Sequence, residues 1–237
     1  ADIAQTENVS NSSPSQKQLK NLLAFYQNKQ LSNAEKLAKS ITQEFPKYQF
    51  GWKILSSILA QTGRKLESID AAQKSVQLTP EDAEAHNNLG NTLRQVGRLE
   101  EAEASYIRAG ALKADYAEAH YNLGNVLREK NKIKRSTVSY IKALMLKPNY
   151  ARVLNNLGVT LQESGQLKEA EVSYSKAILL RFDYVEAYNN LGVTLQEQNR
   201  LKEAEKSYKL AVMLDPGYVE AQNNLGVILQ KNNTSDK

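Results

Sequence analysis

Pairs of neighbouring polar residues recur along this chain at a fixed interval of 34 residues. The second residue of the pair is asparagine in five copies, and the first is asparagine in four of them. A carboxamide offers both N–H donors and an acceptor oxygen, so the chemistry expected of these residues is hydrogen bonding to a polypeptide backbone. Asparagine is also a poor helix former, so copies inside helices need a reason. The second-position copies are Asn88, Asn122, Asn156, Asn190 and Asn224.

Each of these pairs is followed directly by Leu-Gly, as in Leu89-Gly90. A fixed period of this length predicts a repeat array, in which each unit packs only against its neighbours. Apolar residues at three- and four-residue steps predict two helices in each unit. A left-handed residue is expected between the two helices, because glycine and asparagine tolerate the conformation that ends a helix. The residues expected at this turn are Gly63, Gly97, Asn131, Gly165 and Asn199.

The glycine of each Leu-Gly pair lies inside a predicted helix, where it costs roughly 1 kcal/mol relative to alanine. We expect the missing side chain to allow close approach of the second helix of the unit. The alanines that lie twelve residues later are the expected partners, namely Ala102, Ala170 and Ala204.

The period divides the chain into a flexible polar lead, a repeat array and a polar tail. The lead covers residues 1–14 and has nothing to bury. The first unit is degenerate, as expected of a terminal repeat with one side facing water. The predicted array covers 15–231, with units 15–48, 49–82, 83–116, 117–150, 151–184 and 185–218, a terminal helix over 219–231 and a tail over 232–237.

The pattern within each unit resembles the tetratricopeptide repeat. One unit carries it in Leu123-Gly124, Leu127, Tyr140, Ala143 and Pro148, and another in Tyr188, Leu191-Gly192, Leu195, Ala204, Tyr208, Ala211 and Pro216. The resemblance implies an all-α fold, a right-handed superhelical solenoid of helix-turn-helix repeats whose first helices line the concave side. Ser56 in place of glycine and Ser136 in place of alanine depart from the pattern.

The Asn-Leu-Gly spelling is similar to the repeat region of O-linked N-acetylglucosamine transferases and related bacterial proteins with repeats and a transferase domain. That resemblance implies an asparagine ladder that holds a polypeptide substrate in the groove. The catalytic domain of that family follows its repeats, and no part of this chain corresponds to it. The alternative to a general peptide-binding module is therefore the substrate-recruiting arm of a larger glycosyl- or other transferase.

The predicted peptide-binding residues lie on the side of the first helices that faces away from the second helices. Two alternatives stay open: the asparagines bond to neighbouring helices, and Arg94 and Arg128 pair with nearby acids instead of a ligand carboxylate. The candidates are Asn87, Asn88, Asn91, Arg94, Tyr121, Asn122, Asn125, Arg128, Asn155, Asn156, Asn189, Asn190, Asn223 and Asn224.

The terminal helix presents an apolar face that a second helix would cover in the other units. Exposed apolar surface invites association, so a self-associating scaffold and a homo-oligomer are a further alternative. The residues predicted to mediate it are Val219, Leu225, Ile228 and Leu229.

Composition argues against catalysis. The chain has no cysteine, and its two histidines, His86 and His120, occupy equivalent repeat positions that hold Trp52 and Tyr188 elsewhere, so they are expected to pack. We expect no enzyme activity, catalytic residue, cofactor or metal. The net charge of +5 is spread among alternating acids and bases, so a nucleic-acid partner is not expected. No apolar run could span a bilayer, and we expect a cytoplasmic protein with a protein or peptide ligand and no membrane partner.

Overall fold

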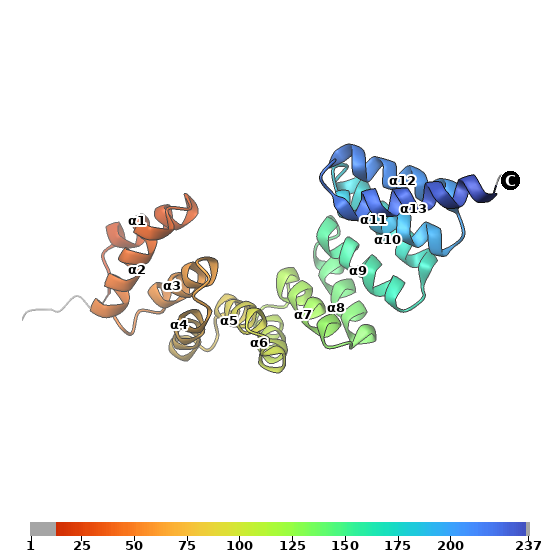
Figure 1. Ribbon diagram of the computed structural model, residues 1–237. Helices are drawn as coiled ribbons and strands as arrows, with labels where there is room; N and C mark the ends of the chain where they lie inside the picture. The colour runs from red at the N-terminus through yellow and green to blue at the C-terminus, as the bar shows by residue number, and fades with distance from the viewer. Residues whose placement is uncertain (1–12, 236–237) are drawn as a thin grey trace, which may run out of the picture. The chain divides into compact units, whose positions relative to one another are not determined.

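The computed structural model describes residues 13–235, with side chains placed as far as residue 231. This part of the chain folds into thirteen α-helices joined by short turns (Figure 1), which confirms the all-α prediction. The helices are α1 (Gln16–Gln27), α2 (Leu31–Glu44), α3 (Gln49–Gln61), α4 (Lys65–Leu78), α5 (Ala83–Gln95), α6 (Leu99–Leu112), α7 (Ala117–Glu129), α8 (Ile133–Leu146), α9 (Ala151–Glu163), α10 (Leu167–Leu180), α11 (Val185–Glu197), α12 (Leu201–Leu214) and α13 (Val219–Ser235). The last helix extends beyond the end expected at residue 231, and residues 1–12 of the expected lead lie outside the described part.

The helices belong to two compact units, with α1–α6 in unit 1 and α7–α13 in unit 2. From α3 to α11, each odd-numbered helix packs most extensively against the even-numbered helix that follows it, and α13 packs mainly on α12. In unit 2, α7, α9, α11 and α13 also touch one another in succession. These odd-numbered helices form a continuous surface, the inner face of unit 2, made by the solvent-facing side chains of residues 117–129, 151–163, 185–197 and 219–231.

The turn inside each repeat depends on a residue in the left-handed region. Glycine and asparagine adopt that conformation at modest cost, and the sequence prediction is confirmed at all five positions. Lys29 does the same in the first repeat (φ 56°), whereas Asn28 before it, the C-cap of α1, has a φ of −81°. The five predicted residues have φ values of 79° (Gly63), 78° (Gly97), 56° (Asn131), 76° (Gly165) and 62° (Asn199).

The Leu-Gly glycines of α5, α7, α9 and α11 are required by tyrosine rings. A Cβ atom built on Gly124 would lie 2.5 Å from the ring of Tyr140, and one on Gly192 would lie 2.5 Å from Tyr208. Such distances are shorter than van der Waals contact, so any side chain there would force the ring to move. The expectation that the later alanines impose this constraint is therefore wrong, although Ala170 and Ala204 are buried nearby.

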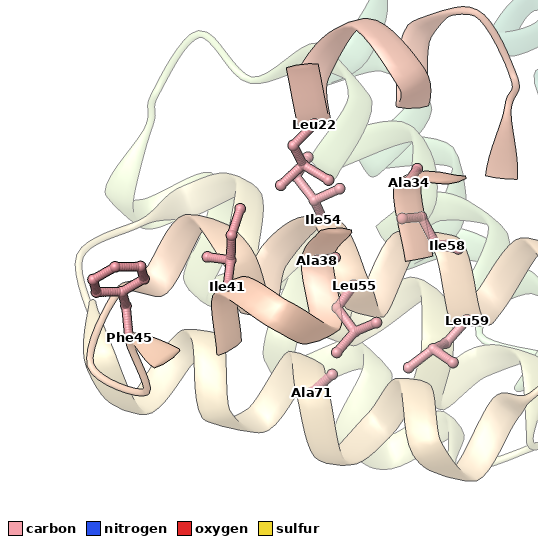
Figure 2. Close-up of a cluster of buried hydrophobic side chains, with 10 residues drawn as sticks. All are labelled: Leu22, Ala34, Ala38, Ile41, Phe45, Ile54, Leu55, Ile58, Leu59 and Ala71. Atoms are coloured by element: carbon pink, nitrogen blue, oxygen red, sulfur yellow. The ribbon is translucent and has the colours of Figure 1, made fainter. Parts of the chain in front are cut away.

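The first two repeats solve the same packing problem with different residues. Ser56 occupies the glycine position of the second repeat, and Ala72 occupies the tyrosine position. In the first repeat these positions hold Leu22 and Ala38, which lie in one cluster of buried hydrophobic side chains in unit 1 (Figure 2). A larger residue on the first helix thus accompanies a smaller one on the second, as constant core volume requires.

Asp82 links two helices of unit 1 at the start of α5. Its Oδ1 atom accepts the amides of Glu84 (2.9 Å) and Ala85 (3.1 Å), and its Oδ2 atom accepts the Lys53 ammonium at 3.0 Å. Burial raises the pKa of Asp82, but the Lys53 ammonium and the Ala85 amide outweigh it and hold the pKa below its ordinary value. A depressed folded pKa adds stability above the unfolded pKa, and that stability is lost as the pH falls through the folded pKa.

We predict that Asp82→Asn lowers the free energy of unfolding by about 1–2 kcal/mol at neutral pH, because a charged hydrogen-bond acceptor is lost. The difference from wild type should begin to shrink below the ordinary aspartate pKa of about 4 and vanish below the lower folded pKa, where the native carboxylate also gains a proton. Urea unfolding at neutral and acidic pH measures both. The exposed Asp70→Asn serves as the control, and an equal loss at both pH values would show that the charge does not matter.

Candidate functional site

The asparagine pairs of unit 2 tie each first helix to the previous one. The Nδ2 atom of Asn190 donates to Oδ1 of Asn155 at 3.2 Å. The same bond joins Asn224 to Asn189 at 2.9 Å. Asn156 donates to Asn125 at 2.9 Å, because Tyr121 replaces the first asparagine of that pair. The alternative that the asparagines bond to neighbouring helices instead of a ligand therefore describes the amide nitrogens of Asn156, Asn190 and Asn224.

The stripe expected to be exposed is in large part covered. Asn189 is fully buried, because its Nδ2 donates to Glu220 and its Oδ1 accepts from Asn224, both on the next first helix. Stacking of first helices side by side encloses the first positions Tyr121, Asn155 and Asn189, each of which the next first helix covers. The expectation of exposure is thus wrong for six candidates, namely Asn87, Tyr121, Asn122, Asn125, Asn155 and Asn189. Asn223 is exposed, and Asn88, Asn91, Arg94, Arg128, Asn156, Asn190 and Asn224 are half-buried.

The half-buried asparagines of unit 2 share one orientation. Their amide groups turn toward the preceding helix, and the carbonyl oxygens of Asn190 and Asn224 accept no hydrogen bond from any residue that the structure describes. The oxygen of Asn156 has only a 3.5 Å contact with Asn155. A row of acceptor oxygens with fixed orientation therefore runs along the inner face of unit 2.

Asn88 lies in a different setting in unit 1. Its Nδ2 atom is 3.5 Å from the Ser57 hydroxyl, at the limit of a hydrogen bond. It borders a pocket between α1, α3 and α5, in which the Tyr26 hydroxyl accepts from Gln61 at 3.0 Å. The pocket is lined by Tyr26, Ser56, Ser57, Ala60, Gln61, Asn88, Asn91, Thr92 and Gln95.

The buried tyrosines explain why the first helices carry asparagine in some repeats and valine in others, one helical turn after the asparagine pair. The hydroxyls of Tyr106 and Tyr140 donate to the Oδ1 atoms of Asn91 (2.8 Å) and Asn125 (2.7 Å) respectively. The next two repeats have Val159 and Val193 at that position. There Tyr174 donates to Gln162 at 3.1 Å, and Tyr208 to Gln196 at 3.3 Å.

Where the later of the two positions holds arginine, which cannot accept a hydrogen bond, the earlier one holds asparagine to accept from the buried hydroxyl. Where the later position holds glutamine, the glutamine accepts and the earlier position can be valine. Burial raises the pKa of Tyr208 to about 12, so the hydroxyl keeps its proton and remains a donor. Asn91 and Asn125 therefore have a structural role that the sequence analysis missed. The concerted change of Asn91 and Arg94 to Val159 and Gln162 was the signal for it.

Arg128 is already paired within unit 2. Its guanidinium donates to Glu163 at 3.0 Å. Burial alone would lower the pKa of Arg128, but the ion pair with Glu163 outweighs it and raises the pKa. The alternative that this arginine pairs with a nearby acid describes its state in the structure.

Tyr121 belongs to an aromatic cluster at one edge of the inner face. Its ring centroid lies 5.4 Å from that of Tyr150 and 6.2 Å from that of Tyr140. The Arg152 guanidinium lies 5.5 Å from the Tyr121 ring. Arg152 occupies the repeat position that holds glutamate in the neighbouring repeats, as Glu118 and Glu186. With Glu220 in the last repeat, the exposed edge of the inner face carries three carboxylates and one guanidinium.

The histidine position has a structural role in several repeats. His86 Nε2 lies 3.0 Å from the carbonyl oxygen of Pro80. Trp52 donates to Pro46 at 2.9 Å in the same way. Gln222 donates to Pro216 at 2.6 Å. The side chain at this position thus ties the start of the first helix to the preceding loop. Within the described part of the chain, no three His, Asp or Glu side chains converge to hold a metal ion.

The last helix differs from the face predicted for self-association. Ile228 is fully buried and packs with Leu195, Ala204 and Tyr208. It points back into the array, so its assignment to an exposed face is wrong. Val219 and Leu229 are exposed, and Leu225 is half-buried. Association through α13 stays a prediction, and a test of it requires substitution of Leu229, because a change at Ile228 would disturb the core.

Helix pairs that recur every 34 residues and stack through their neighbours define a helical repeat protein. Models of the tetratricopeptide repeat match residues 71–104, 90–127, 124–165 and 150–215. Together they cover 71–215, more than half of the 237 residues. The chain therefore belongs to the tetratricopeptide repeat proteins, which act as protein-interaction modules. No curated protein matches the chain.

Several solved structures share this fold at low sequence identity. One is YrrB, described as a TPR protein with an unusual peptide-binding site, with a TM-score of 0.65, 19% identity, and coverage of 78% of this chain and 96% of YrrB. MamA gives a TM-score of 0.65 and 23% identity, covering 70% of this chain and 97% of MamA. A chain of the APC/C hetero-tetramer Cut9-Hcn1 gives a TM-score of 0.77 and 16% identity over 90% of this chain and 42% of that chain.

These similarities concern the fold, and the resemblance to the transferases stays a prediction. Among the described residues, no helix has both the length and the apolar character needed to cross a membrane.

Proposed function

We propose that the protein binds an extended polypeptide along the inner face of unit 2. The observation that carries the proposal is the row of half-buried Asn156, Asn190 and Asn224, each held in one orientation by the preceding repeat. An extended strand presents backbone N–H groups at regular intervals, and fixed carboxamide oxygens can accept them whatever the ligand sequence. Preorganised acceptors lose little conformational entropy when the ligand binds.

The side chains beside the asparagines favour particular ligand side chains, in addition to the backbone hydrogen bonds. Val159, Val193 and Val227 lie one helical turn from the three asparagines and offer an apolar shelf beside the oxygens. Arg128 is neutralised by Glu163, and Arg152 supplies the one guanidinium at the edge position. Excess carboxylates remain at Glu118, Glu186 and Glu220. We therefore propose a ligand with lysine or arginine side chains, in contrast to the carboxylate ligand considered from the sequence.

The asparagines have a second role, because they also connect the repeats. A plain loss of binding after Asn→Ala changes could thus reflect a loosened array. Aspartate separates the two roles, since it keeps an acceptor oxygen and cannot donate to the preceding asparagine. Asn190→Asp with Asn224→Asp should retain or strengthen binding of a basic peptide, while the matching Asn→Ala pair should weaken it.

We predict that the Asn190→Ala, Asn224→Ala variant binds peptides about tenfold more weakly, since each neutral hydrogen bond contributes about 1 kcal/mol. Wild type and variants are compared on an array of random peptides, and the best ligands are titrated by fluorescence anisotropy. Circular dichroism monitors helix content, and Asn149→Ala, in an exposed loop, is the control. Unchanged binding by the alanine pair would assign the asparagines to the fold alone, and no peptide binding by wild type would refute the proposal.

A further inference from the structure

The second helices of unit 2 expose large apolar side chains at one repeated position. Met145 of α8 is 77% exposed, Leu179 of α10 is 85% exposed and Met213 of α12 is 68% exposed. Phe182, in the turn after α10, is 80% exposed. Because the three helices repeat one structure, equivalent side chains project from it in the same way. These four residues are called the apolar ridge.

The repeat fold does not require this ridge. The equivalent position is also exposed in unit 1, where it holds Gln43, Gln77 and Ala111. Those repeats form the same helix pairs with polar or small residues. The residue that follows the ridge position is leucine in both units, at Leu78, Leu112, Leu146, Leu180 and Leu214, so the ridge position itself distinguishes unit 2. A surface this apolar, confined to one unit, indicates a contact with another molecule.

The charges beside the ridge are mainly positive. Lys142 and Lys176 lie about one helical turn before Met145 and Leu179, are exposed, and form no ion pair with any residue that the structure describes. Helix α8 carries Lys134, Arg135 and Lys142 and no acid. The acids of α10 and α12 lie in the first half of each helix. Asp183 follows Phe182 and pairs with Arg181 at 3.1 Å, and Asp215 lies two residues after Met213. The lysines that flank Met145 and Leu179 favour an anionic partner with an apolar interior.

We propose that the apolar ridge docks on the surface of a bilayer that contains anionic lipids. The ridge side chains would enter the boundary between head groups and acyl chains, and the lysines would meet lipid phosphates and carboxylates. A two-fold contact of this ridge with the ridge of a second copy would instead place Lys142 and Lys176 against the same lysines, which is repulsive. The sequence analysis expected no membrane partner because no segment can span a bilayer, but contact with its surface needs no spanning helix.

The test is co-sedimentation of the whole chain with lipid vesicles. Vesicles of phosphatidylcholine with phosphatidylserine should retain the protein, and vesicles of phosphatidylcholine alone should retain much less. High salt should weaken the first interaction because it screens the lysines. The Met145→Gln, Leu179→Gln, Met213→Gln variant should bind these vesicles at least about tenfold more weakly than wild type, since each apolar side chain loses its burial.

Matched controls separate the ridge from general hydrophobicity. Leu66 and Ile107 are exposed apolar residues of unit 1, and their double replacement by glutamine should leave vesicle binding unchanged. Met145→Leu with Met213→Leu should also retain it. Failure of wild type to bind anionic vesicles, or equal binding by the triple variant, would overturn the proposal. If wild type did not bind vesicles and the triple variant had a lower mass in solution than wild type, the ridge would be a contact between copies of the chain. That result would also overturn the proposal.

Discussion

Replacement of Gly192 by alanine should destabilise unit 2, whereas the same replacement at Gly226 should not. Alanine within a helix normally stabilises by up to about 1 kcal/mol relative to glycine. At Gly192 the added Cβ would lie 2.5 Å from the Tyr208 ring, which is fully buried and cannot turn aside without moving its neighbours. Overpacking of this kind costs about 1–3 kcal/mol, so the net change should be a loss.

Gly226 provides the control within the same chain. It occupies the same repeat position in α13, and no atom lies within 4 Å of the Cβ that alanine would add. Urea unfolding followed by circular dichroism measures both variants, and their midpoints should move in opposite directions. If Gly192→Ala also stabilised the protein, the tyrosine contact could not be the reason for glycine in the helix.

The helices, their order and the turn residues were predictable from the sequence because each depends on local physics. A period of 34 residues, apolar spacing and left-handed glycines are properties of single repeats, and Asn131 and Asn199 show that the turn prediction extended beyond glycine. The exception was Lys29, whose conformation the surrounding helices impose without a sequence signal.

The exposure of the inner face was not predictable in the same way. A helical wheel places Asn189 on the side away from its partner helix, but α13 covers it through Asn224 and Glu220. Burial of this kind arises between repeats, so one repeat examined alone does not contain it. The same reason explains Ile228, which a wheel assigns to an apolar face but which packs on Tyr208 of the preceding repeat.

The partner of the in-helix glycine was missed for a different reason. Every full repeat contains a glycine at the position of Gly192 and a tyrosine at the position of Tyr208. Neither residue alone indicates that the two are in contact. The first repeats contained the missing information, since Ser56 occurs where the tyrosine position has become Ala72. Paired changes across repeats of one chain thus report contacts, much as covarying positions do between homologues.

Two positions of the first helix change together, from asparagine with arginine (Asn125 and Arg128) to valine with glutamine (Val159 and Gln162). This paired change leads to a prediction with a large expected effect. Gln162→Arg should lower the free energy of unfolding by about 1–3 kcal/mol, because the buried Tyr174 hydroxyl loses its only acceptor. Gln162 also donates to Glu197. An arginine at position 162 could still donate to Glu197, as Arg128 donates to Glu163 at the equivalent place in the preceding repeat. The Thr194 hydroxyl would also lose its 3.2 Å bond to Gln162, but it keeps its bond to the Asn190 carbonyl. Most of the cost should therefore come from the tyrosine hydroxyl.

A second change in the same repeat should restore the hydroxyl bond. Val159→Asn places a carboxamide where Asn125 accepts from Tyr140 in the preceding repeat. The double variant Val159→Asn, Gln162→Arg should be more stable than the sum of the two single effects by about 1 kcal/mol or more, which a double-mutant cycle in urea measures. Tyr174→Phe supplies the control, because without the hydroxyl the coupling should vanish. Strict additivity with Tyr174 intact would show that the two repeat types differ for a reason other than satisfaction of the tyrosine.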